Sequence, residues 1–590
     1  MRDVPLRRVA SLAFAAGVLG ALVALSEVRA ADGPLTMSAS GRNGTRLDAL
    51  VDGNAITLRA QLAAPAPVDT QIVFHLDGTS APVGRCTIAA AAIHCDTPAF
   101  RTLGWAWGQG EKPGTTRTLI AVAASGRLRT SLDIAITPRP VILVHGFLST
   151  AATWLAYSGR NGFLASIGVE GYAVGDERAG GVMNTGDIGR PAGSTATLQE
   201  NAASLARYIG EVRARTGAEM VDIVAHSMGG LIARFYIARL MPQRDVAQLL
   251  MMGPPHGGSD CSGLPSALGL YGPASLELRP AYLRQIFNPA ITQRHGVPFH
   301  ILAGNAIIEG FKAPCTDVPS DMVVAQDSAS AVPGVVTTLP VLHTDMTASE
   351  DVFRHFVRPH LLRGPGEFPE ADDPEVSAEA IVPAQFTQVS AGRVPAGGSV
   401  DVEVNLDAVS IASFALFDPS RSLDVTIRGA SGNVITLTAR EHGLIRVDDP
   451  ATMVHLGYGF AHPKPGPWRV TLRAARDLGA DYALSARVVG GATLRAGASA
   501  LTPRAGQAVT LSASLELAGA TLSDMSMEAI VHQPDGRSQR LPLRRSEAGM
   551  ATQWRPSRPG IHGVDIVARA RTGAVRIERT AFLAVDVLPR

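Results

Sequence analysis

The sequence has no excess of charge of either sign, and this balance excludes whole classes of partner. Its 53 lysines and arginines face 52 aspartates and glutamates, which leaves a formal charge of +1 over 590 residues. A nucleic-acid partner would require a basic surplus, and no block of like charges favours a polyanion. Cysteine is also scarce, and because none of the four shows C-x₂-C spacing we expect no zinc site.

Long apolar runs are scarce as well. One run, Val9 to Leu25, follows a basic segment and precedes the small-residue site Val28-Arg29-Ala30. This pattern predicts a secretory signal peptide over residues 1–30, since the run is shorter than the ~18 apolar residues of a membrane span. No later segment is apolar enough to cross a bilayer. We therefore expect an exported protein, periplasmic or extracellular, with cell-surface association and the export route left open.

Export favours disulfides over free thiols, and four cysteines allow three pairings. Cys86 and Cys95 lie in one region of short strands, so we expect them to pair across a hairpin. Cys261 and Cys315 both lie further along, and a second bridge between them is the natural complement.

The chain is too long for one hydrophobic core, and the pattern of expected strands and helices changes along its length. Residues 31–138 read as short strands between turns, which predicts an N-terminal β-sandwich of immunoglobulin-like texture. Over residues 139–362 buried strands alternate with helices, which predicts an α/β core with a mainly parallel sheet. Residues 363–379 form an acidic, proline-rich linker. Beyond it, alternating strands predict two further β-sandwiches, residues 380–492 and 493–590, the second immunoglobulin-like.

The most informative motif is Ala-His-Ser-Met-Gly-Gly at residues 225–230. An apolar run precedes it and an amphipathic run follows, so strand, sharp turn and helix are expected in that order. This is the context of a nucleophile elbow, which lifts Ser227 out of the sheet edge. There a histidine can take its proton and backbone N–H groups can meet an oxyanion. The small residues Ala225 and Gly229 relieve crowding at such a turn.

Four further motifs accompany the elbow: V-H-G-F, P-P-H-G-G-S, S-D-M-V-V and L-H-T-D. Together the five resemble those of secreted bacterial lipases and esterases, α/β-hydrolases similar to triacylglycerol lipases and to GPI inositol-deacylase-like esterases. The resemblance covers about residues 138–362. It implies an α/β-hydrolase core with an inserted cap at about residues 256–295, and glycine-rich residues 171–193 are a second candidate for loops over the site.

The resemblance also implies a role for particular residues. Ser227 is the expected nucleophile, and the chain order Ser, acid, His is that of α/β-hydrolases. His343, after the last expected strand, is the expected base. Asp321 fits the acid position, although Met322 stands where lipases usually have glycine. The candidate acids that compete with Asp321 are Asp317 and Asp327.

The remaining expected residues come from three places: the loop after the first expected strand of the core, the residue after Ser227, and the P-P-H-G-G-S motif. The backbone N–H groups of Phe147 and Met228 are the expected oxyanion donors. A structural or pocket-lining role is expected for His145, Gly146 and His256.

These features favour a secreted serine carboxylic-ester hydrolase, a lipase or esterase, that forms an acyl-serine intermediate. Its partner would be an ester, with a lipid or insoluble substrate left open, and it would need no metal or cofactor. The first alternative is a thioesterase, amidase, polyester depolymerase or acyltransferase on the same fold. The second is a non-catalytic surface-binding protein. The role of the C-terminal modules, as tethers or as packing partners, stays open, as does the oligomeric state.

Overall fold

The computed structural model describes residues 35–107, 113, 116–187, 190, 193–363, 384–436, 445–446, 455–546 and 549–590. The expected signal peptide lies outside the described residues, as does the expected linker apart from its first residue. No helix within the described ranges is long and apolar enough to cross a membrane. The chain divides into two compact units. The larger holds Asp133–Arg590 together with Leu47–Ile56 and Phe100–Arg117, and the smaller holds most of the N-terminal strands.

The N-terminal strands form two sheets. One has the order β1-β3-β6 with β7 beside β3, and the other has the order β2-β9-β8-β4-β5. The strands are β1 (Leu35–Gly41), β2 (Ala49–Val51), β3 (Ala55–Leu62), β4 (Thr70–Leu76), β5 (Pro82–Ile88), β6 (His94–Asp96), β7 (Phe100–Arg101), β8 (Thr116–Ala123) and β9 (Arg129–Thr137). Cys86 of β5 and Cys95 of β6 form a disulfide.

The centre of the larger unit is a six-stranded sheet of order β11-β10-β12-β13-β14-β15, in which every pair is parallel. The strands are β10 (Val141–Val144), β11 (Gly171–Ala173), β12 (Val221–His226), β13 (Val246–Met252), β14 (Phe299–Gly304) and β15 (Val335–Leu339). All residues of β10, β12 and β13 are buried, as expected of strands covered on both faces. The predicted parallel sheet is therefore present, and β11 adds an edge strand within the glycine-rich segment that we expected to be a loop.

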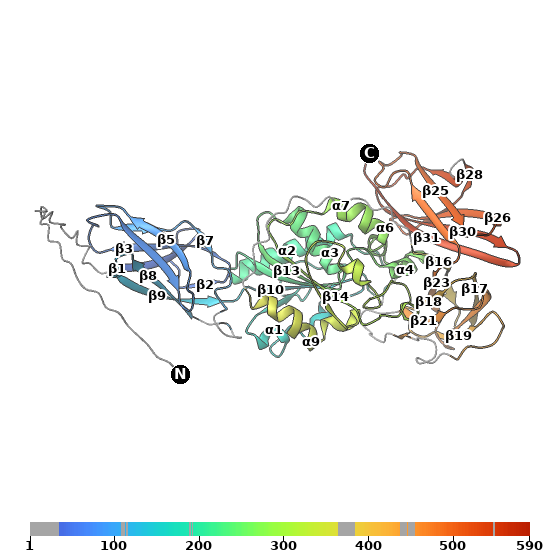
Figure 1. Ribbon diagram of the computed structural model, residues 1–590, viewed down its shortest axis with the longest axis horizontal. Coiled ribbons are helices and arrows are strands. Elements are labelled where there is room, and N and C mark those ends of the chain that lie inside the picture. Colours follow the sequence, from blue (N-terminus) through green and yellow to red (C-terminus); the bar gives the residue numbers. More distant parts are fainter. Residues whose placement is uncertain are drawn as a thin grey trace, which may run out of the picture. The chain divides into compact units, whose positions relative to one another are not determined.

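Helices cover both faces of this sheet. Figure 1 shows α2 and α3 on one side and α1 and α9 on the other. The longest helix, α2, starts at the capping box predicted from the sequence, because Thr197 accepts from the backbone of Glu200 and Glu200 returns the bond. The helical elements are η1 (Ala151–Trp154), α1 (Phe163–Ser166), α2 (Leu198–Thr216), α3 (Met228–Phe235), η2 (Tyr236–Leu240), η3 (Asp260–Ser262), α4 (Gly263–Ala267), α5 (Ala274–Glu277), α6 (Pro280–Tyr282), η4 (Leu283–Phe287), α7 (Asn288–Ala290), η5 (Gly310–Lys312), α8 (Gln326–Ala329), η6 (His343–Thr347), α9 (Glu350–Val352), η7 (Phe353–Val357) and α10 (Arg358–Leu361).

The C-terminal strands form sheets of nine, three and four strands, with the orders β20-β21-β18-β23-β16-β31-β30-β26-β27, β17-β22-β19 and β24-β25-β29-β28. The strands are β16 (Phe386–Val394), β17 (Ser399–Leu406), β18 (Ile411–Phe417), β19 (Asp424–Arg428), β20 (Ile445–Arg446), β21 (His455–Ala461), β22 (Gly466–Arg473), β23 (Ala480–Val489), β24 (Thr493–Ala498), β25 (Val509–Glu516), β26 (Ser523–His532), β27 (Ser538–Pro542), β28 (Arg544–Ser546), β29 (Gly549–Trp554), β30 (Gly560–Thr572) and β31 (Val575–Val587).

The nine-stranded sheet runs through the position, near residue 492, where we expected one module to end and the next to begin. Strands β16 and β31 join its two halves where Phe386 pairs with Thr580. Each half still has its own apolar core, since one buried cluster draws on β17, β18 and β22 and another on β25, β26 and β30. The two C-terminal regions thus share one sheet while they keep separate cores.

Candidate functional site

Ser227 stands in a strained turn between β12 and α3. Its backbone has φ 54° and ψ −128°, a conformation that L-residues rarely adopt. Hydrogen bonds hold the turn, because the Ser227 N–H donates to the Met252 carbonyl and the Ser227 carbonyl accepts from Gly230. A Cβ atom on Gly229 would lie 2.6 Å from the Val144 carbonyl oxygen. Glycine is therefore required there, as expected for a tight strand-to-helix elbow.

Asp321 and His343 follow strands β14 and β15 in the chain, and their side chains meet. Nδ1 of His343 lies 2.7 Å from Oδ2 of Asp321, and the side chains are buried, with 5% and 1% of the two residues exposed. The other carboxylate oxygen of Asp321 accepts from the N–H groups of Val323 and Val324, at 3.0 and 2.7 Å. These bonds leave the carboxylate one orientation, toward the imidazole.

The two competing acids do not reach His343. Asp317 is 73% exposed at its side chain and pairs with Arg487. Asp327 is exposed on the short helix α8. Met322 has φ 86°, a conformation that favours glycine. Met322 thus adopts a backbone conformation that glycine adopts most easily, at the position where the lipase pattern has glycine.

His226 contacts His343 from the strand side, a contact that the sequence did not predict. Its Nε2 donates to the His343 carbonyl oxygen at 2.9 Å, and the two ring centroids lie 4.7 Å apart. Burial, together with the charges of His343 and His145, lowers the pKa of His226 to about 3. Burial likewise lowers the pKa of His145 to about 4. Both rings are therefore neutral near pH 7, and His226 serves to hold the backbone of His343.

The loop after β10 approaches Ser227 very closely. A Cβ atom on Gly146 would lie 2.7 Å from the Ser227 Cβ and 3.3 Å from its Oγ. Within the described part of the chain, no acceptor takes a hydrogen bond from the backbone N–H of Phe147 or of Met228. The N–H groups of both expected oxyanion donors are thus unused. Phe147 lies on the loop after β10, and Met228 is the first residue of α3.

Ser227 and His343 line a small apolar cavity with a volume of ≈ 50 Å³. The expected cap contributes to its wall, as do the loop after β10, which is the expected oxyanion loop, and the loop around Asp321, which is the expected acid loop. Its lining residues are Phe147, Leu148, His226, Ser227, Pro255, Ser259, Cys261, Ser262, Pro265, Leu278, Val323, Val324 and His343. The Cys261–Cys315 disulfide fixes one side of it.

His256 does not line this cavity. It is fully buried, and its Nδ1 lies 3.0 Å from Nη1 of Arg234, while its carbonyl accepts from Asn288. Burial, with the charges of Arg234 and Arg294, holds its pKa well below the usual value. Of the two roles expected for His256, the structural one fits.

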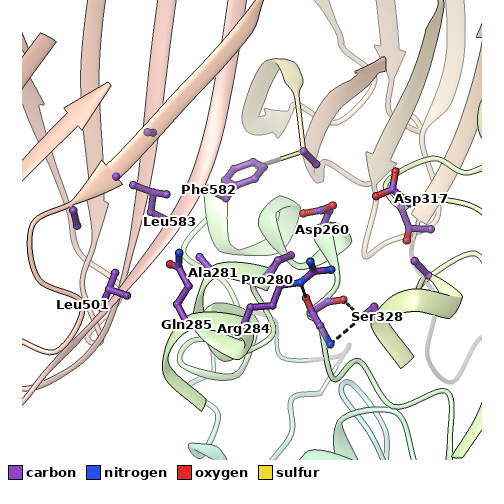
Figure 2. Close-up of a pocket in the computed structure, with 18 residues that line it drawn as sticks. Asp260, Pro280, Ala281, Arg284, Gln285, Asp317, Ser328, Leu501, Phe582 and Leu583 are labelled. Carbon is purple, nitrogen blue, oxygen red and sulfur yellow. Dashed lines mark hydrogen bonds between the residues drawn. The ribbon is translucent and has the colours of Figure 1, made fainter. Parts of the chain in front are cut away.

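A larger cavity of ≈ 250 Å³ lies nearby but does not contain Ser227. Figure 2 shows Phe582 and Leu583 of β31 across it from Pro280 and Ala281 of α6. Asp260 also lines it, and burial raises the pKa of that carboxyl to about 6, against the lowering effect of Arg487 and Arg284. The candidate chemistry belongs to the smaller cavity. Among the described residues, no group of three or more His, Cys, Asp or Glu could hold a metal ion.

The fold and this geometry define a class. A parallel sheet with a serine in the turn after one strand, and an acid and a histidine after two later strands, is the arrangement of an α/β-hydrolase domain. Residues 187–250 match the family model of class 2 lipases. The central domain is therefore similar to lipase- and esterase-like α/β-hydrolases.

Two curated relatives are triacylglycerol lipases. The chain is 32% identical over 158 residues to one from Burkholderia plantarii, which is 26% of this chain and 40% of that lipase. It is 35% identical over 129 residues to one from Pseudarthrobacter phenanthrenivorans, which is 21% of this chain and 36% of that lipase. The chain thus spans 40% or less of the length of each.

A solved structure resembles more of the chain. The propeptide form of the lipase BlEst2 from Bacillus licheniformis matches 76% of this chain and 94% of its own, with a TM-score of 0.50 and 15% identity. At that identity the match speaks for the fold alone.

Proposed function

We propose that this protein is an exported serine esterase that hydrolyses carboxylic esters through an acyl-serine intermediate. The observation that carries the proposal is the 2.7 Å contact between Nδ1 of His343 and Oδ2 of Asp321, beside the cavity that Ser227 and His343 both line. This contact leaves Nε2 of His343 as the nitrogen that can take the serine proton. Triacylglycerol lipases among the relatives support an ester as the substrate.

In the proposed reaction His343 takes the proton of Ser227 while the serine Oγ attacks the ester carbonyl carbon. The N–H groups of Phe147 and Met228 bind the resulting oxyanion, and Asp321 stabilises the imidazolium. His343 then gives its proton to the departing alcohol. In the second half His343 takes a proton from water, and the water oxygen attacks the acyl carbon. His343 then returns the proton to the Ser227 oxygen, so that the free serine and the carboxylic acid are released.

We infer that the flanking regions are β-sandwich modules and that residues 1–30 direct export. The buried clusters that combine strands of two sheets support the first inference. The two disulfides are compatible with an oxidising compartment and support the second.

A fluorophosphonate probe followed by peptide mapping tests the proposed nucleophile. We expect a single adduct on Ser227 and hydrolysis of p-nitrophenyl butyrate by the same preparation. Ser204 of α2 provides a matched control, because it is equally buried, with 8% exposed, but lies away from the site. Ser204→Ala should keep both labelling and activity. Labelling elsewhere, or none, would overturn the assignment, and a panel of thioesters, amides and polyesters would reveal a different acyl substrate.

A further inference from the structure

The C-terminal strands contact the wall of the Ser227 cavity through two aromatic rings. Phe147, which lines the cavity, packs edge-on against Tyr271, with ring centroids 5.7 Å apart. Tyr271 in turn packs edge-on against Phe417 at the end of β18, at 6.3 Å. Phe417 is fully buried in a cluster with Leu148 and Cys261, two further residues of the cavity wall. Strand β18 of the C-terminal region therefore supports Phe147, and with it the loop after β10, through Tyr271.

A buried ion pair makes a second connection. Arg279, at the start of α6, is fully buried, and its Nη1 lies 2.7 Å from Oδ1 of Asp565 on β30. The same guanidinium donates to the Leu583 carbonyl and to Ser266. A Cβ atom on Gly563 would lie 2.8 Å from Cζ of Arg279, so glycine is what lets β30 come this close. Removing one partner of such a pair leaves an uncompensated buried charge.

In the sequence, Arg279 of this ion pair directly follows a residue that lines the cavity. Leu278, directly before Arg279, lines the cavity, and its carbonyl accepts from the Ser259 N–H at 2.9 Å. The Ser259 hydroxyl donates to the Val323 carbonyl at 2.7 Å. Val323 in turn donates its N–H to Asp321. Hydrogen bonds, together with the peptide link between Leu278 and Arg279, thus connect β30 through the expected cap to the loop that carries Asp321.

The cavity that these contacts hold is small. A volume of ≈ 50 Å³ is a few times the roughly 10–15 Å³ that one water needs on the same kind of measure. It therefore accommodates a few non-hydrogen atoms, about the size of an acetyl to butyryl group. Phe147 and Leu278 bound part of this space, and the contacts described above connect both residues to the C-terminal strands.

We propose that the C-terminal strands set the acyl-chain selectivity of the Ser227 site, with Phe417 and Asp565 as the positioning residues, and that they restrict it to short acyl esters. This inference rests on the proposed esterase function. The natural substrate class would be esters of short acids, such as acetyl to butyryl groups. The C-terminal region is then part of the active enzyme rather than a separate tether.

Two substitutions on one strand test the proposal. Phe417→Leu shrinks the ring that supports Tyr271, whereas Phe414→Leu makes the same change on the opposite face of β18, inside the separate C-terminal core. Both phenylalanines are fully buried, so both variants should lose similar stability. The readout is the ratio of kcat/KM for p-nitrophenyl butyrate to that for p-nitrophenyl octanoate, which a general loss of folding does not move.

Octanoate is longer than butyrate by four methylenes, and one misfit methylene changes kcat/KM by roughly 10-fold or more. If only two of the four are misfit, wild-type protein should already prefer butyrate by about 100-fold. Phe417→Leu should reduce this preference to about 10-fold or less, while Phe414→Leu should leave it unchanged. Equal ratios in both variants and the wild type would overturn the proposal, as would an equal change in both variants.

A second matched pair decides the matter if Phe417→Leu does not fold. Asp565→Asn weakens the ion pair with Arg279, and Asp407→Asn weakens an equally buried ion pair with Arg579 that stays within the C-terminal strands. We expect Asp565→Asn alone to reduce the preference for butyrate. A wild-type protein that hydrolyses no ester and binds no fluorophosphonate would refute the proposed function. A wild-type esterase whose preference survives Phe417→Leu and Asp565→Asn would refute only this inference.

Discussion

Substitution of Gly146 by alanine tests the proposed oxyanion loop. The new Cβ would lie 2.7 Å from the Ser227 Cβ and 3.0 Å from the His226 carbonyl oxygen, whereas ordinary contacts between carbon atoms are about 3.5–4.0 Å. The loop or the elbow must therefore shift by about 1 Å. Because Phe147 follows directly, its N–H moves away from the oxyanion, and losing one such donor costs about 10²–10³-fold in kcat.

The assay is kcat for p-nitrophenyl butyrate together with the thermal unfolding midpoint. Overpacking of this kind costs about 1–3 kcal/mol of stability, so the variant should remain folded at room temperature while kcat falls. Gly210→Ala is the control, because Gly210 is exposed on α2 with nothing within 4 Å of the added Cβ. That variant should keep kcat and gain about 0.5–1 kcal/mol from helix propensity. A Gly146→Ala enzyme with wild-type kcat would refute the reasoning.

Three further predictions follow from groups around the site. Asp321→Asn should lower kcat by about 10⁴-fold, measured with the same ester, while Asp317→Asn should keep it; equal activity in both variants would contradict the assignment of the acid. Burial raises the pKa of Asp260 from 3.8 to about 6, so its ionisation destabilises the native state as pH rises through that interval. Asp260→Asn should therefore raise the urea midpoint at pH 8 and not at pH 4. The upper limit of the gain is about 3 kcal/mol, which partial exposure reduces to about 1 kcal/mol; no gain at pH 8 would count against this prediction. The pKa values of buried His145 and His226 lie at about 4 and about 3, below 6.5. The unfolded chain thus binds their protons first, and the stability that is complete above pH 6.5 should fall between pH 6.5 and 4, by about 3 kcal/mol for His145 at pH 4; urea midpoints that stay constant over that range would refute this.

Much of the central domain could be predicted from the sequence, because the patterns that specify its strands and helices are local. Buried strands such as Val141–Val144 read as short continuous apolar runs, and the capping box at Thr197 fixes the start of α2 by itself. The elbow motif places Ser227 between a strand and a helix for the same reason. In each case neighbours in the chain decide the structure.

Features that depend on distant contacts could not be read in this way. Asp317, Asp321 and Asp327 lie within eleven positions of one another, and only the folded loop turns one of them toward the histidine. The role of His226 rests on a backbone carbonyl, an acceptor that every residue offers. The continuous C-terminal sheet depends on a pairing between Phe386 and Thr580, which no alternation pattern within either strand specifies.

The most direct test of the account is the kcat/KM of purified wild-type protein and of Ser227→Ala for p-nitrophenyl butyrate, measured side by side with Ser204→Ala. We predict turnover by the wild type and by Ser204→Ala, and a loss of about 10⁴-fold or more in Ser227→Ala, as in other serine hydrolases that lose the nucleophile. A Ser227→Ala protein that retains wild-type kcat/KM would contradict the central claim that this serine carries the acyl group.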